Sequence, residues 1–340
     1  MKFNKLFILT LLSPVALASN KSTVSFTLDN DGIFGVDHDY TNGIFLSYAT
    51  GQLRKESEWN WLSLNNTSDT NIDKIELVLG HKMWTPSDIE VDYPLANDRP
   101  YAGYLHTEIN YLSLTEDKAV RYNFTIGATG ESALSEKAQS LVHSITGSPD
   151  PQGWDYQIDD YLAFSVGYRA FNKLMRSEGK STQWEITNVN DINAGNFRSD
   201  VSQGVMFRWG TNLGNSIGAA NISVESPFSA SMLSNHASSW FLFTGFEGRY
   251  RFNDITLEGD RSGIPEPSEP YDVTLEHWQT TAVAGATWYN QSYGASITFT
   301  VKTPEYKESP TDIYGTGSFS ALRLLLNRKL KWSINNSLTI

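Results

Sequence analysis

A period-two alternation of apolar and polar residues recurs along this chain from residue 22 onward and constrains its fold more than any other feature. In the stretch VRYNFTI, from Val120 to Ile126, apolar or aromatic residues occupy every second position and polar residues lie between them. Residues 293–301 repeat the pattern. Because successive side chains of a strand point to opposite faces, the alternation predicts β-strands with one apolar and one polar face.

The alternating segments are about ten residues long and are separated by polar turns, as in transmembrane barrels. A soluble β-sandwich also alternates, but its strands are usually shorter. The strand lengths, the aromatic share of 13% and the lack of cysteine favour an all-β fold, a twelve-stranded antiparallel transmembrane β-barrel. The expected strands are residues 22–29, 41–51, 73–83, 103–115, 120–126, 159–171, 182–194, 198–210, 238–252, 276–289, 293–301 and 315–326.

The two ends of the chain depart from this pattern. Residues 1–18 combine two lysines, a short apolar run and the small-residue site Ala16-Leu17-Ala18, which predicts a cleaved secretory signal peptide. Residues 19–340 are then expected to form a single domain. Residues 327–340 also alternate, so they are either a closing strand or a tail; bacterial barrels normally have an even number of strands.

The net charge and the hydropathy of the sequence limit where the protein can be located and what it can bind. A net charge of -12 without a basic tract excludes nucleic acid as an expected partner. No later segment offers the ~20 apolar residues of a membrane helix, so the mature chain is either soluble outside the inner membrane or a barrel in the bacterial outer membrane, with the bilayer as its partner. The sequence does not determine whether such a barrel is a monomer. Aromatic residues expected at the membrane interfaces are Tyr101, Tyr104, Trp240, Trp278 and Trp288.

Two connections on one side of the predicted barrel carry residues capable of chemistry. The stretch DNDGIFGVDHDYTNG, Asp29 to Gly43, is rich in acids. It could be a turn, a solvated acidic loop or a hard-cation site, because calcium prefers oxygen ligands; zinc has less support without cysteine or a paired-histidine motif. Residues 131–145 have the apolar spacing of a helix, on which Ser135, Gln139 and His143 share one face. His143 is then either a general base or a rim histidine that contacts water.

Several segments together resemble the outer-membrane lipid A 3'-O-deacylases, the LpxR-like family. The resemblance lies in LDNDGIFGVDHDYTNGIFLSY, LGHKMWTP, NDRPYAGYL, LVHSITGSPDPQGWDYQ and GNFRSDVSQGVMFRWG, and it covers roughly residues 22–326. It implies a twelve-stranded barrel with a short extracellular-loop helix at the rim. It also implies a hydrolase that removes the 3'-O-linked acyl (acyloxyacyl) group from lipid A of lipopolysaccharide, with Ca²⁺ as cofactor.

The resemblance also assigns residues. His143 matches the catalytic histidine, which activates water as general base, and Gln139 is assigned to the site partly because it shares that helix face. Asn30 and Asp31 match an asparagine-aspartate pair after the first strand, and both are expected to contribute to catalysis and to the calcium site. Thr41 matches a hydroxyl residue of the family's site.

Lys82 matches a lysine of the family that would help stabilise the oxyanion, although His81 precedes it where the family usually has glutamine. Asp37, His38 and Asp39 are expected to form a solvated outer loop. Two alternatives stay open. The chain could be a Ca²⁺-dependent outer-membrane phospholipase, or a non-catalytic barrel that serves as a channel or structural protein.

Overall fold

The computed structural model of the chain describes residues 21–31, 39–55, 57–64, 71–179, 181–234 and 238–326. The signal peptide predicted at residues 1–18, the segment 327–340, and residues Asp37 and His38 lie outside the described residues, so the predictions made for them stay predictions.

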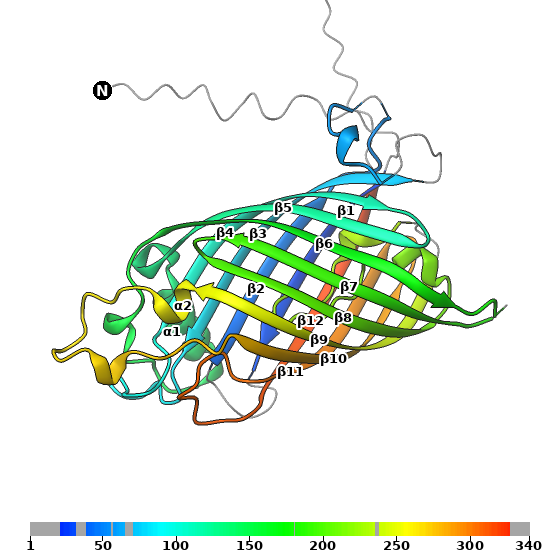
Figure 1. The fold of residues 1–340 in the computed structure, drawn as a ribbon. Helices are drawn as coiled ribbons and strands as arrows, with labels where there is room; N and C mark the ends of the chain where they lie inside the picture. Colours follow the sequence, from blue (N-terminus) through cyan, green and yellow to red (C-terminus); the bar gives the residue numbers. More distant parts are fainter. Residues whose placement is uncertain are drawn as a thin grey trace, which may run out of the picture.

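Twelve antiparallel strands close into a barrel (Figure 1), as the alternation predicts. Each strand pairs with its neighbours in sequence, and β1 closes the barrel on β12, with registers from Lys21 opposite Leu326 to Asn30 opposite Gly317. The strands are β1 (Lys21–Asn30), β2 (Asp39–Ala49), β3 (Ile72–Thr85), β4 (Ala102–Leu114), β5 (Lys118–Thr129), β6 (Leu162–Arg176), β7 (Gln183–Gly195), β8 (Arg198–Gly210), β9 (Ser239–Asp254), β10 (Trp278–Tyr289), β11 (Tyr293–Lys302) and β12 (Tyr314–Leu326).

The polarity of the wall is the reverse of that of a water-soluble protein. Along β8 the buried and exposed positions alternate without interruption. The exposed positions include Val205 and Phe207, whereas the buried ones include Asp200 and Arg208. A wall that faces outward with apolar side chains and inward with polar ones suits a hydrocarbon surround and a hydrated or ion-paired lumen.

Trp240, at the start of β9, is half-buried, and the other four expected aromatic positions divide into two groups. Trp278 and Trp288 are 69% and 52% exposed at the ends of β10, in agreement with a place at the membrane interface. The same expectation is wrong for Tyr101 and Tyr104, which are both buried. Tyr104 faces the lumen and stacks on Phe197 with ring centroids 3.8 Å apart, and Tyr101 lies against a tryptophan beneath a loop.

Helical elements gather mainly at one end of the barrel, called here the helical end. It carries α1 (Ser135–Thr146), which follows β5, and α2 (Ile255–Glu258), which follows β9 (Figure 1). In the described part of the chain, no helix is long and apolar enough to cross a membrane. The 3₁₀ turns are η2 (Asn60–Leu62), η3 (Gly130–Ala133), η4 (Trp154–Tyr156), η5 (Leu213–Ser216), η6 (Ala230–Met232) and η7 (Glu269–Tyr271).

The connection between β8 and β9 folds back into the lumen, and its described residues 211–234 are called the plug. Two cations of the wall hold its base. Arg208 donates to the carbonyl oxygens of Ser216 at 2.6 Å and Leu213 at 2.9 Å, and Lys74 donates to those of Leu233 at 2.6 Å and Ser231 at 3.0 Å. At this base, which lies at the end of the barrel opposite the helical end, buried apolar residues of the plug pack on apolar residues of the wall that point into the lumen.

The plug extends along nearly the whole lumen. It leaves the wall after Gly210, the last residue of β8, yet Glu225 at its tip forms an ion pair with Arg198, the first residue of the same strand. The two ends of a strand of this length are about 40 Å apart, at about 3.3 Å per residue. The plug therefore reaches from the opposite end of the lumen to the helical end, where it lines the remaining cavity.

We expect the intact protein to show no steady ion conductance in planar bilayers, because the plug occupies the lumen. Replacing residues 212–238 with a short Gly-Ser turn should produce a conducting barrel, since Thr211 already pairs with Trp240 at the wall. Equal conductance of the two proteins would contradict this view of the plug.

Candidate active site

Helix α1 lies on the outer face of the barrel wall. Leu77 and Leu79 of β3 are exposed, so His81, two positions further along the strand, also points outward. The His81 Nε2 atom lies 3.0 Å from the carbonyl oxygen of Ala133 and 2.9 Å from Ser135 Oγ. These contacts hold the beginning of α1 against β3 from outside.

The ends of α1 agree with local chain chemistry. Leu134 precedes the helix in the left-handed region, with φ of 59°, and the helix starts at Ser135 rather than at residue 131 as predicted. Gly147 follows with φ of 79°, and its N–H donates to the carbonyl oxygen of His143 at 2.8 Å. A left-handed glycine after the last turn is a common helix stop, and the helix ends at Thr146, one residue beyond the predicted range.

The polar face of α1 is buried and its apolar face is exposed. Ser135, Gln139 and His143 are 1%, 2% and 6% exposed, and they turn toward the barrel wall and loops, so the predicted shared face is confirmed. Leu141 and Ile145 are 63% and 77% exposed on the other side. A helix on an outer barrel wall has lipid rather than water beyond it, which explains why its apolar face can point away from the protein.

His143 is held in one tautomer. Its Nδ1 atom lies 2.5 Å from the carbonyl oxygen of Pro149. A carbonyl oxygen only accepts hydrogen bonds, so Nδ1 carries the proton and Nε2 is the proton-accepting nitrogen. This is the form that a general base requires.

Gln139, one helical turn before His143, has one satisfied and one unsatisfied amide atom. Its Oε1 accepts from Trp154 Nε1 at 2.8 Å, which fixes the orientation of the amide. Its Nε2 is buried and has no hydrogen-bond partner among the described residues. A buried donor without a partner costs about 1–3 kcal/mol, so this N–H group is suited to an acceptor supplied by a ligand.

The ends of β1, β2 and β3 bring the other predicted residues together. Asn30 Nδ2 donates to the carbonyl oxygen of Thr41 at 3.2 Å, and the backbone N–H of Asp31 donates to the same oxygen at 3.4 Å. The Thr41 hydroxyl lies 2.6 Å from that of Thr85 at the end of β3. A register shift between Tyr40 and Asn42 frees Thr41 from the regular ladder for these contacts.

This group offers oxygen donors only: the Asp31 carboxylate, the Asn30 amide oxygen and the hydroxyls of Thr41 and Thr85. Such a set fits a hard cation such as calcium better than zinc. Across the described residues, no three His, Cys, Asp or Glu side chains converge to hold a metal. A cation here would therefore need amide, hydroxyl, water or substrate oxygens as well as a carboxylate.

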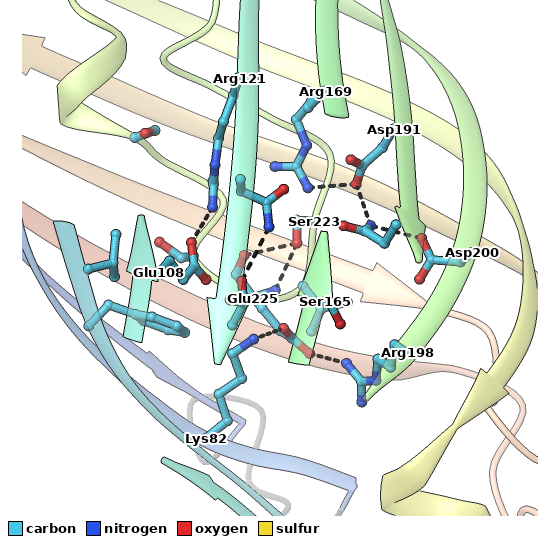
Figure 2. A pocket seen from close by; sticks show the side chains of 18 of the residues that line it. Lys82, Glu108, Arg121, Ser165, Arg169, Asp191, Arg198, Asp200, Ser223 and Glu225 are labelled. Atoms are coloured by element: carbon cyan, nitrogen blue, oxygen red, sulfur yellow. Dashed lines mark hydrogen bonds and ion pairs between the residues drawn. The ribbon is translucent and has the colours of Figure 1, made fainter. Parts of the chain in front are cut away.

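Lys82 is not brought together with α1. It follows His81 directly, so its side chain points to the opposite face of the wall, into the lumen. There its Nζ lies 2.6 Å from Glu225 Oε2 of the plug (Figure 2). Nothing in this geometry lets the ammonium reach an ester beside His143 without crossing the wall.

Asp39 is also in the lumen, and the expectation that it belongs to a solvated outer loop is wrong. It is 2% exposed and pairs with Arg99 and with Lys302, whose Nζ is 2.5 Å away. The next acid in this network is Glu305, 3.0 Å from Lys302 and 3.2 Å from Arg99. Burial alone would raise the pKa of Glu305, but Lys302, Arg198, Arg251 and Arg99 together hold it well below its usual range.

Sequence reasoning missed three residues with direct contacts here. His81 and Trp154 hold α1 and Gln139, and both lie within segments that the family resemblance covers. The outward direction of His81 could have been read from the alternation of β3. The sequence could not predict the role of Glu225, because its partner Lys82 is 143 residues away in the chain.

The comparisons with known proteins fit this architecture. The sequence model of a family described as "Outer membrane protein LpxR" matches residues 6–323. The solved structure of LpxR from Salmonella typhimurium is similar, with a TM-score of 0.75 at 17% identity, and the match covers 88% of this chain and 99% of that one. At this identity the likeness shows the fold.

Other solved barrels match with much lower scores. The β-domain of the Bordetella autotransporter BrkA has a TM-score of 0.40 at 7% identity, over 89% of this chain and 97% of that one. The translocator domain of the autotransporter NalP from Neisseria meningitidis has a TM-score of 0.37 at 8% identity, over 90% of each chain. No curated protein sequence matches this one.

The close approach of α1 to β4 predicts the effect of a single methyl group. A Cβ at Gly103 would lie 2.1 Å from Ser135 Oγ, so Gly103→Ala should push the beginning of α1 off the wall. Spin labels on Ile145→Cys and Leu79→Cys, in a chain without native cysteine, should then report a longer or broader distance distribution. Gly248→Ala is the matched control, because its Cβ would meet nothing within 4 Å. Identical distributions in both variants would contradict the described packing.

Proposed function

The chain belongs to the LpxR family of outer membrane proteins, and from that membership we propose that it is a lipid A 3'-O-deacylase. In this proposal it removes the 3'-O-linked acyl (acyloxyacyl) group from lipid A of lipopolysaccharide in the outer membrane. The observation that carries the proposal is the state of His143, which is buried on the polar face of an outer-wall helix with Nδ1 bonded to a carbonyl oxygen. This arrangement supports a base that is poised at the lipid-facing surface.

His143 Nε2 takes a proton from water as the water oxygen forms a bond with the ester carbonyl carbon. The imidazolium that results is stabilised by its Nδ1–H bond to the carbonyl oxygen of Pro149. When the ester C–O bond breaks, the same nitrogen returns the proton to the sugar oxygen that leaves. Water as nucleophile agrees with the lack of a G-x-S-x-G motif in the sequence.

Gln139 is placed to donate to the ester oxygen as it becomes negative. Its Nε2 is a buried donor that needs an acceptor, and its Oε1 is already held by Trp154. A fixed donor directed at developing charge lowers the barrier without reorganisation during the reaction. Lys82 takes no direct part in this scheme, since it lies in the lumen.

The proposal includes calcium, held by Asp31 and Asn30 with Thr41 beside them. The donor set is composed of oxygen atoms, which suits this cation. Bound there, calcium would supply Lewis-acid stabilisation of the oxyanion. The Asn30 amide and the backbone N–H of Asp31 both donate to the Thr41 carbonyl oxygen, which holds the three residues next to one another.

The exposed face of α1 supports a substrate that stays in the membrane. Leu141, Val142 and Ile145 of α1 are exposed, and so is Leu79 on the outer face of β3, the strand that holds the beginning of α1. Acyl chains of lipid A can contact this face while the ester enters between helix and wall. A phospholipase would use the same chemistry, so the assay must offer both lipids. The channel alternative receives no support from a lumen along which the plug extends.

We expect His143→Ala to lower lipid A deacylation by at least about 10²-fold, the contribution typical of general-base catalysis. Mass spectrometry of lipid A measures the acyl chain lost, and heat-modified mobility on gels checks that the barrel is folded. His277→Ala is the matched control, because its Nδ1 also lies near a backbone carbonyl oxygen, 2.8 Å from that of Arg251, but far from α1 in the chain. Retained activity in His143→Ala would refute the assignment. Release of fatty acid from glycerophospholipid alone would favour the phospholipase.

Chelation of calcium should abolish the activity, and added Ca²⁺ should restore it. Asp31→Asn keeps the shape of the side chain but removes its charge, so half-maximal activity should need about tenfold more Ca²⁺, a change of about 1.4 kcal/mol in binding. Titration of activity against free Ca²⁺ measures this shift. Full activity in excess chelator would contradict the cation site.

A further inference from the structure

We infer that the tip of the plug positions the active site from inside the barrel, with Glu225 as a positioning residue. This inference rests on the proposed function. Glu225 does not touch the candidate site, which lies on the outer face of the wall. Instead, Glu225 contacts Lys82, a lumen-facing residue that directly follows the outward-facing His81 in β3.

Glu225 connects two strands that are not neighbours in the barrel. Its Oε2 lies 2.6 Å from Lys82 Nζ on β3, and its Oε1 pairs with Arg198 on β8. Figure 2 shows the lysine and the arginine approaching this one carboxylate from two sides. Arg198 is fixed in turn, since its Nε lies 2.7 Å from Asp254 Oδ2. The carboxylate therefore ties β3 to a rigid part of the opposite wall.

A second contact ties the plug tip to β1 and β2. The backbone N–H of Ser226 donates to Asp29 Oδ2 at 2.8 Å, and the Tyr40 hydroxyl donates to the same oxygen at 2.9 Å. Asp29 directly precedes Asn30, and Tyr40 directly precedes Thr41. The tip thus holds the lumen-facing neighbours of both residues.

The wall transmits these contacts because it is one strand thick. Lys82 and His81 are adjacent, and His81 binds Ser135 and the carbonyl oxygen of Ala133 on the α1 side. A shift of the Lys82 backbone also moves His81, because the two residues share a peptide unit. The same holds for Asp29 and Asn30. The plug tip consequently fixes three strand ends whose outward residues form the candidate site.

The environment of Lys82 makes this contact hard to replace. Lys82 and Arg198 are buried, and the rings of Phe45, Tyr104 and Phe197 surround Lys82 Nζ at 5.8–6.0 Å. Loss of the Glu225 charge takes from Lys82 and Arg198 the anion that they share, although Arg198 keeps Asp254; two buried cations near each other without that anion are unfavourable. The strand ends then have to move apart or admit water.

The competing explanation is that Glu225 only anchors the plug. The base of the plug has separate anchors, Arg208 and Lys74, which contact residues 213–216 and 231–233. The two explanations can therefore be separated by variants that remove the tip contact and the base contact one at a time. If the tip only anchors the plug, removing its contact should change the stability and the conductance of the protein but not its catalytic rate.

The test compares Glu225→Gln with Lys74→Met in purified protein that is shown to be folded by heat-modified gel mobility. Glu225→Gln should lower kcat on lipid A about tenfold with a smaller change in KM, and should leave the barrel closed to ions. Lys74→Met should lower thermal stability and leave kcat within about twofold. An unchanged kcat in folded Glu225→Gln would overturn the inference.

A double-mutant cycle with Lys82→Met tests whether Glu225 exerts its effect on the site through Lys82. If Lys82 acts through Glu225, the double variant Glu225→Gln, Lys82→Met should be no slower than Lys82→Met alone. Multiplicative losses would mean that the two residues act separately, and would overturn the inference.

A readout without substrate separates this inference from the proposed function. Spin labels on Ile145→Cys and Leu79→Cys should show displacement of α1 in Glu225→Gln, whatever the lipid substrate is. If the unaltered protein releases nothing from lipid A, the proposed function fails, and an α1 displacement would still support the positioning role. No displacement together with unchanged turnover would refute that role.

Discussion

Everything in this molecule depends on a wall that is one β-strand thick and closed on itself. Closure leaves no unpaired strand edge, so every backbone polar group of the wall is satisfied within the hydrocarbon layer. The same geometry sends consecutive side chains to different environments. His81 reaches a helix outside the barrel, and Lys82 reaches the plug inside it. Two adjacent residues can thus take unrelated partners and still be mechanically linked.

The lumen at the helical end is an ion-paired interior rather than an open pore. Its cavity of about 190 Å³ is lined by charges of both signs, many of which pair with one another. Consecutive ion pairs link nine charged residues into one network. In order, they are Lys82, Glu225, Arg198, Asp254, Arg251, Glu305, Arg99, Asp39 and Lys302. These charges are buried or half-buried and each pairs with the next, so the network holds the strand ends in one arrangement. The outer face that carries α1 is supported by this interior.

The candidate site lies where helix α1 covers polar residues on the outer face of the wall. Helix α1 presents the buried side chains of His143 and Gln139 on one face and an exposed apolar surface on the other. Asn30, Thr41 and Thr85 supply oxygen atoms from three adjacent strand ends. An ester buried at a lipid interface could meet water, base and cation there without leaving the membrane.

The sequence alone determined the twelve strands, because side-chain direction repeats every two residues and is visible as alternation. It also placed Ser135, Gln139 and His143 on one face, because the helical repeat depends only on local geometry. It could not determine the partners of Lys82, Asp39 or Glu225. A charged residue in a sequence carries no sign of whether it meets water, a ligand or another charge. Only the closed barrel decided this, since closure brought a plug tip 143 residues distant against Lys82 and buried Asp39 beside Arg99.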